Sequence, residues 1–207
     1  MNIYANRNKL FAFLAAPAAL LLAACGASDN ASAVDPGEPP LSGATIGGEF
    51  VLSNSAGETV RWADFDGRYR IVYFGYAYCP DICPTDMQRT VRGLNQFADE
   101  SPRLAAMVQP IFITIDPERD TGEVLDEFTG AFSDDVIGLR GTAEQTAAVA
   151  DTFKIFYSRG EDAPGGGYLM NHSGIVYLFD PAGEPLATLP VDEGADAVTA
   201  ELAKWVN

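Results

Sequence analysis

The chain has 207 residues, of which 29 are acidic and 13 are lysine or arginine, so its formal net charge is −16 at pH 7. An acidic surface repels nucleic-acid phosphates, and we therefore expect no nucleic-acid partner. The length suits one globular domain with a terminal extension. Soft metal ligands are scarce, because the chain has three cysteines, four methionines and one histidine.

Residues 1–24 have the layout of a lipoprotein signal peptide. Arg7 and Lys9 precede an apolar run over residues 10–22, and small residues lead to Cys25. The run is shorter than the ~20 residues of a membrane-spanning helix, which favours a cleaved leader. In bacterial signals of this kind the cysteine carries the lipid, so Cys25 is the predicted lipidation site. We expect a lipoprotein anchored at the inner (cytoplasmic) membrane and facing the periplasm or the cell exterior. Thiols oxidise readily outside the cytoplasm.

Residues 25–42 are mostly Ala, Ser, Gly, Pro and acidic residues, with few large apolar side chains. Such a composition cannot bury enough apolar surface to fold, so it predicts a flexible tether after Cys25. The folded domain is expected over residues 43–207.

The folded part begins with a predicted hairpin and continues with buried strands. Residues 49–52 and 59–61 flank a turn at 54–57, which is a hairpin signal. Continuous apolar runs at 71–74, 111–115 and 175–179 lack polar alternation. Runs of this kind are typical of central strands covered on both faces.

Helices are predicted between these strands. Apolar residues share one face in four segments: Met87, Val91, Leu94 and Phe97; Val124, Leu125, Phe128 and Phe132; Val149 and Phe153; Val198, Leu202 and Trp205. The third of these opens with the capping box Thr142-x-x-Gln145. A short strand at 136–139 and a closing hairpin around the turn at 180–183 complete the order. This order predicts an α/β fold, a thioredoxin-like three-layer sandwich with an added N-terminal hairpin.

Cys79 and Cys83 stand in the run Cys-Pro-Asp-Ile-Cys-Pro. Proline disfavours helical geometry in the residue before it and suits the first helical position, so a helix is predicted to begin at Pro84 with Cys83 at its cap. Both thiols then lie at the positive end of that helix. Unpaired N–H groups and the helix dipole favour the thiolate there, which is the form that binds metal or attacks disulfides.

His172 immediately precedes the run at 175–179. If that strand lies beside 71–74, as thioredoxin-like order requires, its beginning comes close to Cys79 and Cys83. Two thiolates and one imidazole form a soft donor set that Cu(I) accepts readily and Cu(II) accepts with a further weak ligand, whereas zinc normally requires a fourth donor. We therefore predict a copper site formed by Cys79, Cys83 and His172.

Other readings of the two cysteines stay open. They could form a structural disulfide, with His172 as an ordinary surface residue. They could also be the catalytic pair of a thiol-disulfide oxidoreductase, although three residues separate them instead of the usual two. A peroxidase is less favoured, because residues 76–78 lack the serine or threonine expected before its cysteine. Outside such dithiol chemistry, we do not expect an enzyme.

Three motifs resemble those of the Sco/SenC family in sequence, order and separation. They span residues 74–85, 115–121 and 168–173, and the resemblance extends over about 43–207. It implies a thioredoxin-like fold, copper ligands at Cys79, Cys83 and His172, and copper delivery to the dinuclear copper site of cytochrome c oxidase subunit II or another cuproprotein. A copper donor chaperone and a membrane anchor are also implied. The alternatives are a reductase of the target's copper-site cysteines, and a copper or redox sensor.

Two positions within these motifs need comment. The residue before the family's histidine is often aspartate, whereas this chain has Asn171. An amide lacks the charge that would support a metal-bound imidazole, so we expect a different affinity or partner choice. Residues 116–120 have no evident ligand chemistry; we expect a turn at a strand end, with Arg119 paired to a carboxylate.

Overall fold

The computed structural model describes residues 37–162 and 166–207. The predicted signal peptide, the lipidation site at Cys25 and most of the predicted tether lie outside these residues, so they stay predictions. Among the described residues, no helix is both long and apolar enough to span a bilayer.

Seven strands form one sheet in the order β2-β1-β5-β4-β3-β8-β9. They are β1 (Val51–Asn54), β2 (Thr59–Arg61), β3 (Tyr69–Gly75), β4 (Val108–Thr114), β5 (Ile137–Arg140), β8 (Val176–Phe179) and β9 (Pro185–Thr188). The neighbours β3, β4 and β5 are parallel, whereas β8 is antiparallel to β3. Every residue of β3 and β4 is buried, which explains the unbroken apolar runs and confirms their predicted central place. The predicted N-terminal hairpin is β1 and β2, joined to the sheet through β5.

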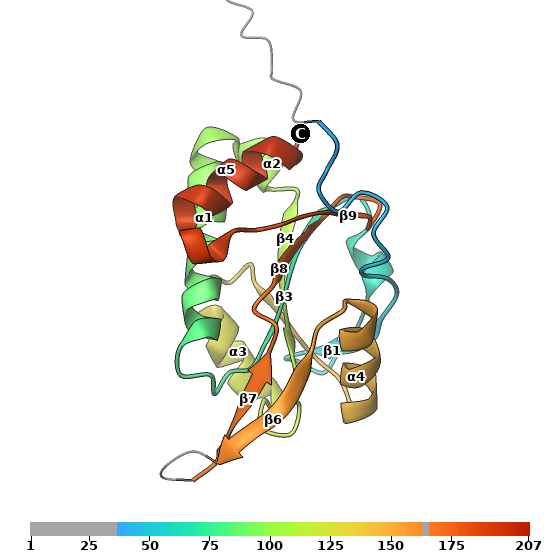
Figure 1. Cartoon of the computed structure of the whole chain (residues 1–207), viewed down its shortest axis with the longest axis vertical. Coiled ribbons are helices and arrows are strands. Elements are labelled where there is room, and N and C mark those ends of the chain that lie inside the picture. The colour runs from blue at the N-terminus through green and yellow to red at the C-terminus, as the bar shows by residue number, and fades with distance from the viewer. Residues whose placement is uncertain (1–36, 163–165) are drawn as a thin grey trace, which may run out of the picture. The chain divides into compact units, whose positions relative to one another are not determined.

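Helices cover both faces of this sheet and give the predicted three layers (Figure 1). They are α1 (Ile82–Glu100), α2 (Pro102–Ala105), α3 (Gly122–Gly130), α4 (Ala143–Thr152) and α5 (Ala195–Trp205). Figure 1 shows α1, α3 and α5 on one side and α4 on the other. The predicted capping box is present, because Thr142 Oγ1 accepts from the Gln145 N–H while the Gln145 side chain accepts from the Thr142 N–H.

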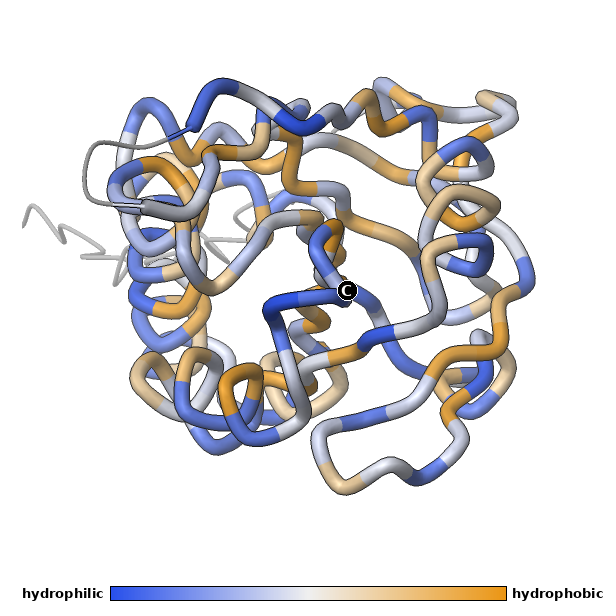
Figure 2. The backbone as a smooth tube through the Cα atoms, turned by 90° about the horizontal axis from the view of Figure 1, so that it is seen from below, coloured by the Kyte–Doolittle hydropathy of each residue, from blue (hydrophilic) through white to orange (hydrophobic). Residues whose placement is uncertain are grey.

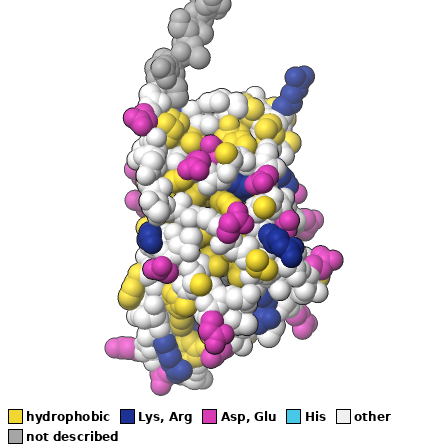
Figure 3. All heavy atoms as spheres, turned by 90° about the vertical axis from the view of Figure 1, so that its right-hand side faces the viewer, with side chains coloured by type: hydrophobic (Ala, Val, Ile, Leu, Met, Phe, Trp, Pro, Cys, Tyr) yellow, Lys and Arg dark blue, Asp and Glu magenta, His cyan; other side chains and the backbone are white. Residues whose placement is uncertain are grey.

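The charge and hydropathy patterns match this layered arrangement. In Figure 2, hydrophilic and hydrophobic residues alternate along the helical turns, as expected for helices with one face on the sheet. Figure 3 shows Asp and Glu side chains spread over one face of the domain rather than gathered in one patch. On that face the acidic residues act as a solvated coat.

A second, two-stranded sheet was not predicted. It is a ribbon of β6 (Tyr157–Asp162) and β7 (Tyr168–His172), antiparallel and separate from the main sheet. Half-buried and exposed residues alternate along β7, so Tyr168, Met170 and His172 share its inner face. The ribbon therefore carries the chain's one histidine toward the end of β3.

Candidate metal centre

The cysteine loop connects β3 with α1. The helix begins at Ile82 with Asp81 as its N-cap, two residues earlier than predicted. Pro84 is accommodated inside the first turn because the first N–H groups of a helix have no partner within it. The predicted placement of both thiols at the helix N-terminus still holds, since the Cys83 N–H donates to Cys79 Sγ at 3.4 Å.

The two cysteines are free thiols in unlike surroundings. Cys83 is fully buried, and Cys79 is 9 % exposed. The pKa of Cys79 is lowered to about 3, chiefly because the Cys83 side chain hydrogen-bonds to its sulfur, with help from His172 and backbone N–H groups. The same hydrogen bond, together with burial, raises the pKa of Cys83. The pair therefore gives up one proton easily and retains the other between its sulfurs.

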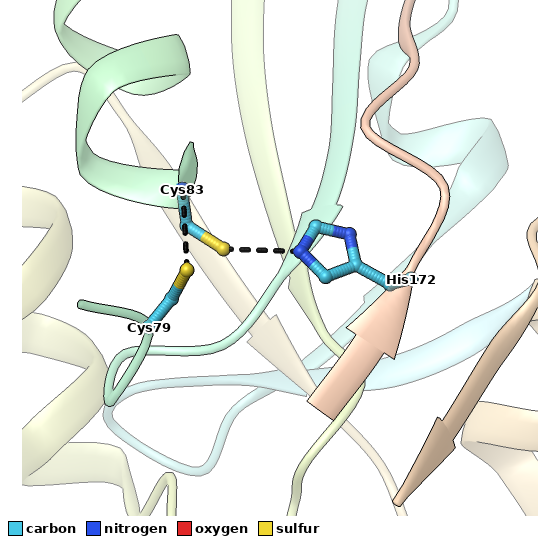
Figure 4. Close-up of side chains that lie close together, drawn as sticks. All are labelled: Cys79, Cys83 and His172. Carbon is cyan, nitrogen blue, oxygen red and sulfur yellow. Dashed lines mark hydrogen bonds between the residues drawn. The ribbon is translucent and has the colours of Figure 1, made fainter. Parts of the chain in front are cut away.

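His172 completes the cluster from the end of β7, with Nε2 3.3 Å from Cys83 Sγ (Figure 4). Its Nδ1 lies 3.1 Å from the Ser173 carbonyl oxygen. A carbonyl only accepts, so Nδ1 carries a proton, and Nε2 is the ring nitrogen that faces the sulfurs and would bind a metal. The adjacency predicted for this histidine is confirmed, because Val176 at the start of β8 pairs with Tyr73 near the end of β3.

The three donor atoms all lie within 4.8 Å of one another. Metal–ligand bonds of about 2.0–2.3 Å place the donors of a three-coordinate ion roughly 3.5–4 Å apart. Small adjustments would therefore close this set on one ion. Within the described residues, these side chains are the one group of three or more His, Cys, Asp or Glu with such spacing.

Two tyrosines for which the sequence indicated no role at the metal also belong to the site: Tyr73 in β3 and Tyr76 in the cysteine loop. The rings of Tyr73 and Tyr76 each lie 6.1 Å from the imidazole, edge to face. The Tyr73 hydroxyl donates to Asp86 Oδ2 at 3.0 Å and also interacts with the Cys83 thiol. The Tyr76 hydroxyl interacts with Cys79 and with the backbone of β7. Neither a tyrosine in a continuously buried strand nor one in a loop gives a sequence signal for such contacts.

Asn171 does not take the position expected of an imidazole partner. It is exposed and neighbours His172 in β7, so the two side chains point to opposite faces of the ribbon. Its side chain lies over Gly160, where an added Cβ would be 3.3 Å from Nδ2. The imidazole is oriented by the Ser173 carbonyl instead.

A family model described as SCO1/SenC matches residues 38–207. The chain belongs to the SCO1/SenC family. It is 33 % identical to the human mitochondrial protein SCO1 homolog over 160 residues, covering 76 % of this chain and 52 % of that protein. The chain thus spans about half the length of the curated relatives it matches.

Solved structures agree with this membership. The copper-bound crystal structure of ScoI from Arabidopsis thaliana has a TM-score of 0.70 and 32 % identity, covering 77 % of this chain and 96 % of that one. The thioredoxin domain of a thiol-disulfide oxidoreductase from Bacteroides vulgatus has a TM-score of 0.55 and 18 % identity, covering 78 % and 96 %. At that identity it supports the thioredoxin-like fold alone.

Proposed function

We propose that this Sco/SenC protein binds one copper ion through Cys79, Cys83 and His172 and delivers it to the dinuclear copper site of cytochrome c oxidase subunit II. The observation that carries this proposal is the convergence of a histidine with a cysteine 89 residues away, at 3.3 Å. Soft thiolate and imidazole donors suit copper. The copper-bound structures of Arabidopsis and yeast Sco proteins, 32 % and 30 % identical, support the same choice.

The unlike thiols suggest the order in which the site would fill. Cys79 is ionised at neutral pH, because its pKa is about 3, and it is the more exposed sulfur. It would take up the ion first. Coordination by Cys83 then requires release of the remaining thiol proton, after which His172 Nε2 completes the set. In delivery, incoming thiolates of the target would replace these ligands one at a time.

The chain offers an apolar rim for such an exchange. Tyr78 and Ile82, each next to a cysteine, are 53 % and 45 % exposed. Contiguous exposed apolar patches mark surfaces that meet another protein, and these two side chains would supply the apolar contact beside the sulfurs. Subunit II or another cuproprotein would approach here, and a copper donor chaperone would use the same opening.

The test is copper titration of the reduced protein in a Cys25→Ser background, which removes the third thiol. We expect one tightly bound copper per chain and a sulfur-to-copper absorption band. Cys79→Ala, Cys83→Ala and His172→Ala should each abolish stoichiometric tight binding while circular dichroism stays unchanged. Met170→Leu is the matched control, because it removes a soft sulfur that lies on the same strand face as His172. Parental binding by His172→Ala would overturn the three-ligand site.

A second candidate, reduction of a disulfide in the target's copper site, is favoured by the ionised Cys79. The Cys79 thiolate would attack the target disulfide and release one target thiolate; Cys83 would then displace the second and leave a Cys79–Cys83 disulfide. Two features weigh against efficient reduction. A low thiol pKa stabilises the reduced form and makes the pair more oxidising, and a raised pKa makes Cys83 a poor resolving thiol. A strongly reducing potential with fast exchange on an oxidised target peptide would favour the reductase.

We propose further that Cys25 is lipidated and holds the domain at the outer face of the inner membrane through the tether at residues 25–42. The support is the sequence pattern before Cys25. Mass spectrometry of the membrane-extracted protein should show a lipid-modified Cys25 at the N-terminus. Recovery of the whole chain with an unmodified residue 25 would contradict the anchor.

A sensor without a delivery role would retain this anchor but have no cuproprotein partner in crosslinking experiments.

A further inference from the structure

The family motif at residues 115–121 lies between the cysteine loop and the histidine ribbon. Its expected ion pair is present, because Arg119 Nε donates to Asp116 Oδ2 at 2.5 Å. Asp116 is 3 % exposed and Asp120 is fully buried. Burying a carboxylate costs free energy unless the carboxylate is hydrogen-bonded. A turn that faces solvent therefore does not explain the burial of these two aspartates.

One side of this motif holds the ribbon. Arg119 Nη1 donates to the Tyr168 carbonyl oxygen at 2.7 Å, and its guanidinium lies 3.7 Å from the centre of the Tyr168 ring. The Tyr168 hydroxyl donates to Asp116 Oδ1 at 2.9 Å. Hydrogen bonds with one ionised partner are stronger than neutral ones. Three contacts therefore fix the first residue of β7, the strand that ends at His172.

The other side of the motif holds the cysteine loop. The Ala77 N–H donates to Asp120 Oδ2 at 2.9 Å. The Arg119 guanidinium also lies 5.6 Å from the ring centre of Tyr76 and 5.2 Å from that of Tyr78. All three residues of the loop directly before Cys79 are thus bound to Arg119 or to its neighbouring aspartate.

This bridge matters because, among the residues that the structure describes, the β6–β7 ribbon has no strand pairing with the seven-stranded sheet. The main sheet fixes the cysteine loop through β3, whereas His172 lies at the end of the ribbon, four residues before Val176 begins β8 in that sheet. We propose that Arg119, with Asp116 and Asp120, is the positioning device that holds the ribbon against the cysteine loop and so sets the distance from His172 Nε2 to the sulfurs. This inference depends on the proposed copper function only in the experiments that measure copper binding.

The principal test compares Arg119→Met with Arg140→Met. Arg140 donates to the Pro117 and Asp120 carbonyl oxygens, so it braces the same turn, and within the described part of the chain it makes no hydrogen bond to the ribbon or to the cysteine loop. Loss of a residue that orients a metal ligand typically lowers affinity about 10- to 100-fold. We expect that loss in copper titrations of Arg119→Met and parental affinity in Arg140→Met.

A double-mutant cycle separates positioning from general loosening. If Arg119 acts through the histidine, Arg119→Met should have no further effect on the weak copper binding that a His172→Ala protein retains. A merely structural role would weaken binding by the same factor in both backgrounds, and that result would overturn the proposal.

A measurement without metal keeps this test independent of the copper function. His172 is the chain's only histidine, so the acylation of a tag-free protein by diethyl pyrocarbonate reports on it alone. We expect several-fold faster acylation in Arg119→Met and an unchanged rate in Arg140→Met. Should Arg119→Met fail to fold, Tyr168→Phe, which removes only the hydroxyl bond to Asp116, should show a smaller increase. Parental acylation rates in the variants that fold would refute the positioning role, whereas faster acylation in a protein that binds no copper would refute only the proposed function.

Discussion

Gly75, the last residue of β3, is placed where any side chain would press on the site. A Cβ added there would lie 3.0 Å from Cys83 Sγ and 2.9 Å from a ring carbon of Phe112. Both neighbours are fully buried. Gly75 also accepts a backbone hydrogen bond from Ile115 at 2.8 Å, which ties its position to β4. A methyl group at residue 75 therefore has no free space and displaces the sulfur or the ring.

The size of the effect follows from these distances. Ordinary carbon–sulfur contacts need several tenths of an ångström more than the space available, and overpacking of this kind costs about 1–3 kcal/mol of stability. Metal–ligand distances tolerate only about ±0.2 Å. A displaced Cys83 Sγ would thus weaken copper binding by about tenfold or more, which corresponds to about 1.4 kcal/mol or more of binding free energy.

The assay is copper titration of Gly75→Ala beside two matched glycine variants, with urea unfolding of each apo protein. At Gly138 an added Cβ would be 2.7 Å from Leu125, so Gly138→Ala should lose stability but retain copper affinity. At Gly130, in α3, an added Cβ meets nothing within 4 Å, so Gly130→Ala should retain parental copper affinity and be at least as stable as the parent. Equal copper affinity in Gly75→Ala and Gly138→Ala would refute the claim that the Gly75 backbone makes room for the sulfur.

Three further predictions concern the surroundings of the site. Because the pKa of Cys79 is about 3, Cys79 stays a thiolate down to mildly acidic pH. In a Cys25→Ser protein, the rate of its alkylation by iodoacetamide should therefore be nearly constant from pH 7 to 5. The alkylation rate of an ordinary thiol falls about tenfold per pH unit below its pKa of ~8.5. Tyr73→Phe removes the hydroxyl bond to Asp86 and should lower the free energy of unfolding by about 1 kcal/mol in urea titrations. Asn171→Asp should leave copper affinity and the charge-transfer band unchanged, because residue 171 faces away from the imidazole; a clear gain in affinity would contradict this geometry.

The sequence predicted the main sheet well for a physical reason. Strands β3 and β4 are buried at all positions, so their apolar runs are long and unbroken. The capping box before α4 is similarly local, since its hydrogen bonds join Thr142 and Gln145 within one turn. A strand buried on both faces, or a motif formed by neighbouring residues alone, can be recognised directly in the amino-acid sequence.

The β6–β7 ribbon left no such pattern. Strand β6 is half-buried at best, contains Gly160 and ends in acidic residues, and the pairing with β7 shifts register between Arg159 and Asp162. Helix α1 begins before Pro84 because the first helical turn needs no N–H from that residue. The ribbon thus depends on tertiary packing, whereas the start of α1 is set by a local tolerance for proline that the sequence rule did not include.

The site was predictable only in part, and the division follows the same physics. Cys79, Cys83 and His172 could be selected because few other soft donors exist in the chain. Tyr73, Tyr76 and Arg119 could not, since a tyrosine in a buried strand or a loop and an arginine in a turn are usual in any fold. Their roles arise only when the ribbon, the cysteine loop and the turn after β4 meet in space.

The three donors differ in how firmly the fold holds them, and this difference suits the proposed release of the metal to a target. Cys83 lies fully buried in the first turn of α1 and has the least freedom. Cys79 lies on the loop beside the exposed Tyr78 and can be reached by an incoming ligand. His172 arrives on a separate ribbon that side chains attach to the body. Because a ligand leaves most easily where it is least constrained, exchange would begin at His172 and Cys79, and the ion would remain on Cys83 until the target has bound it.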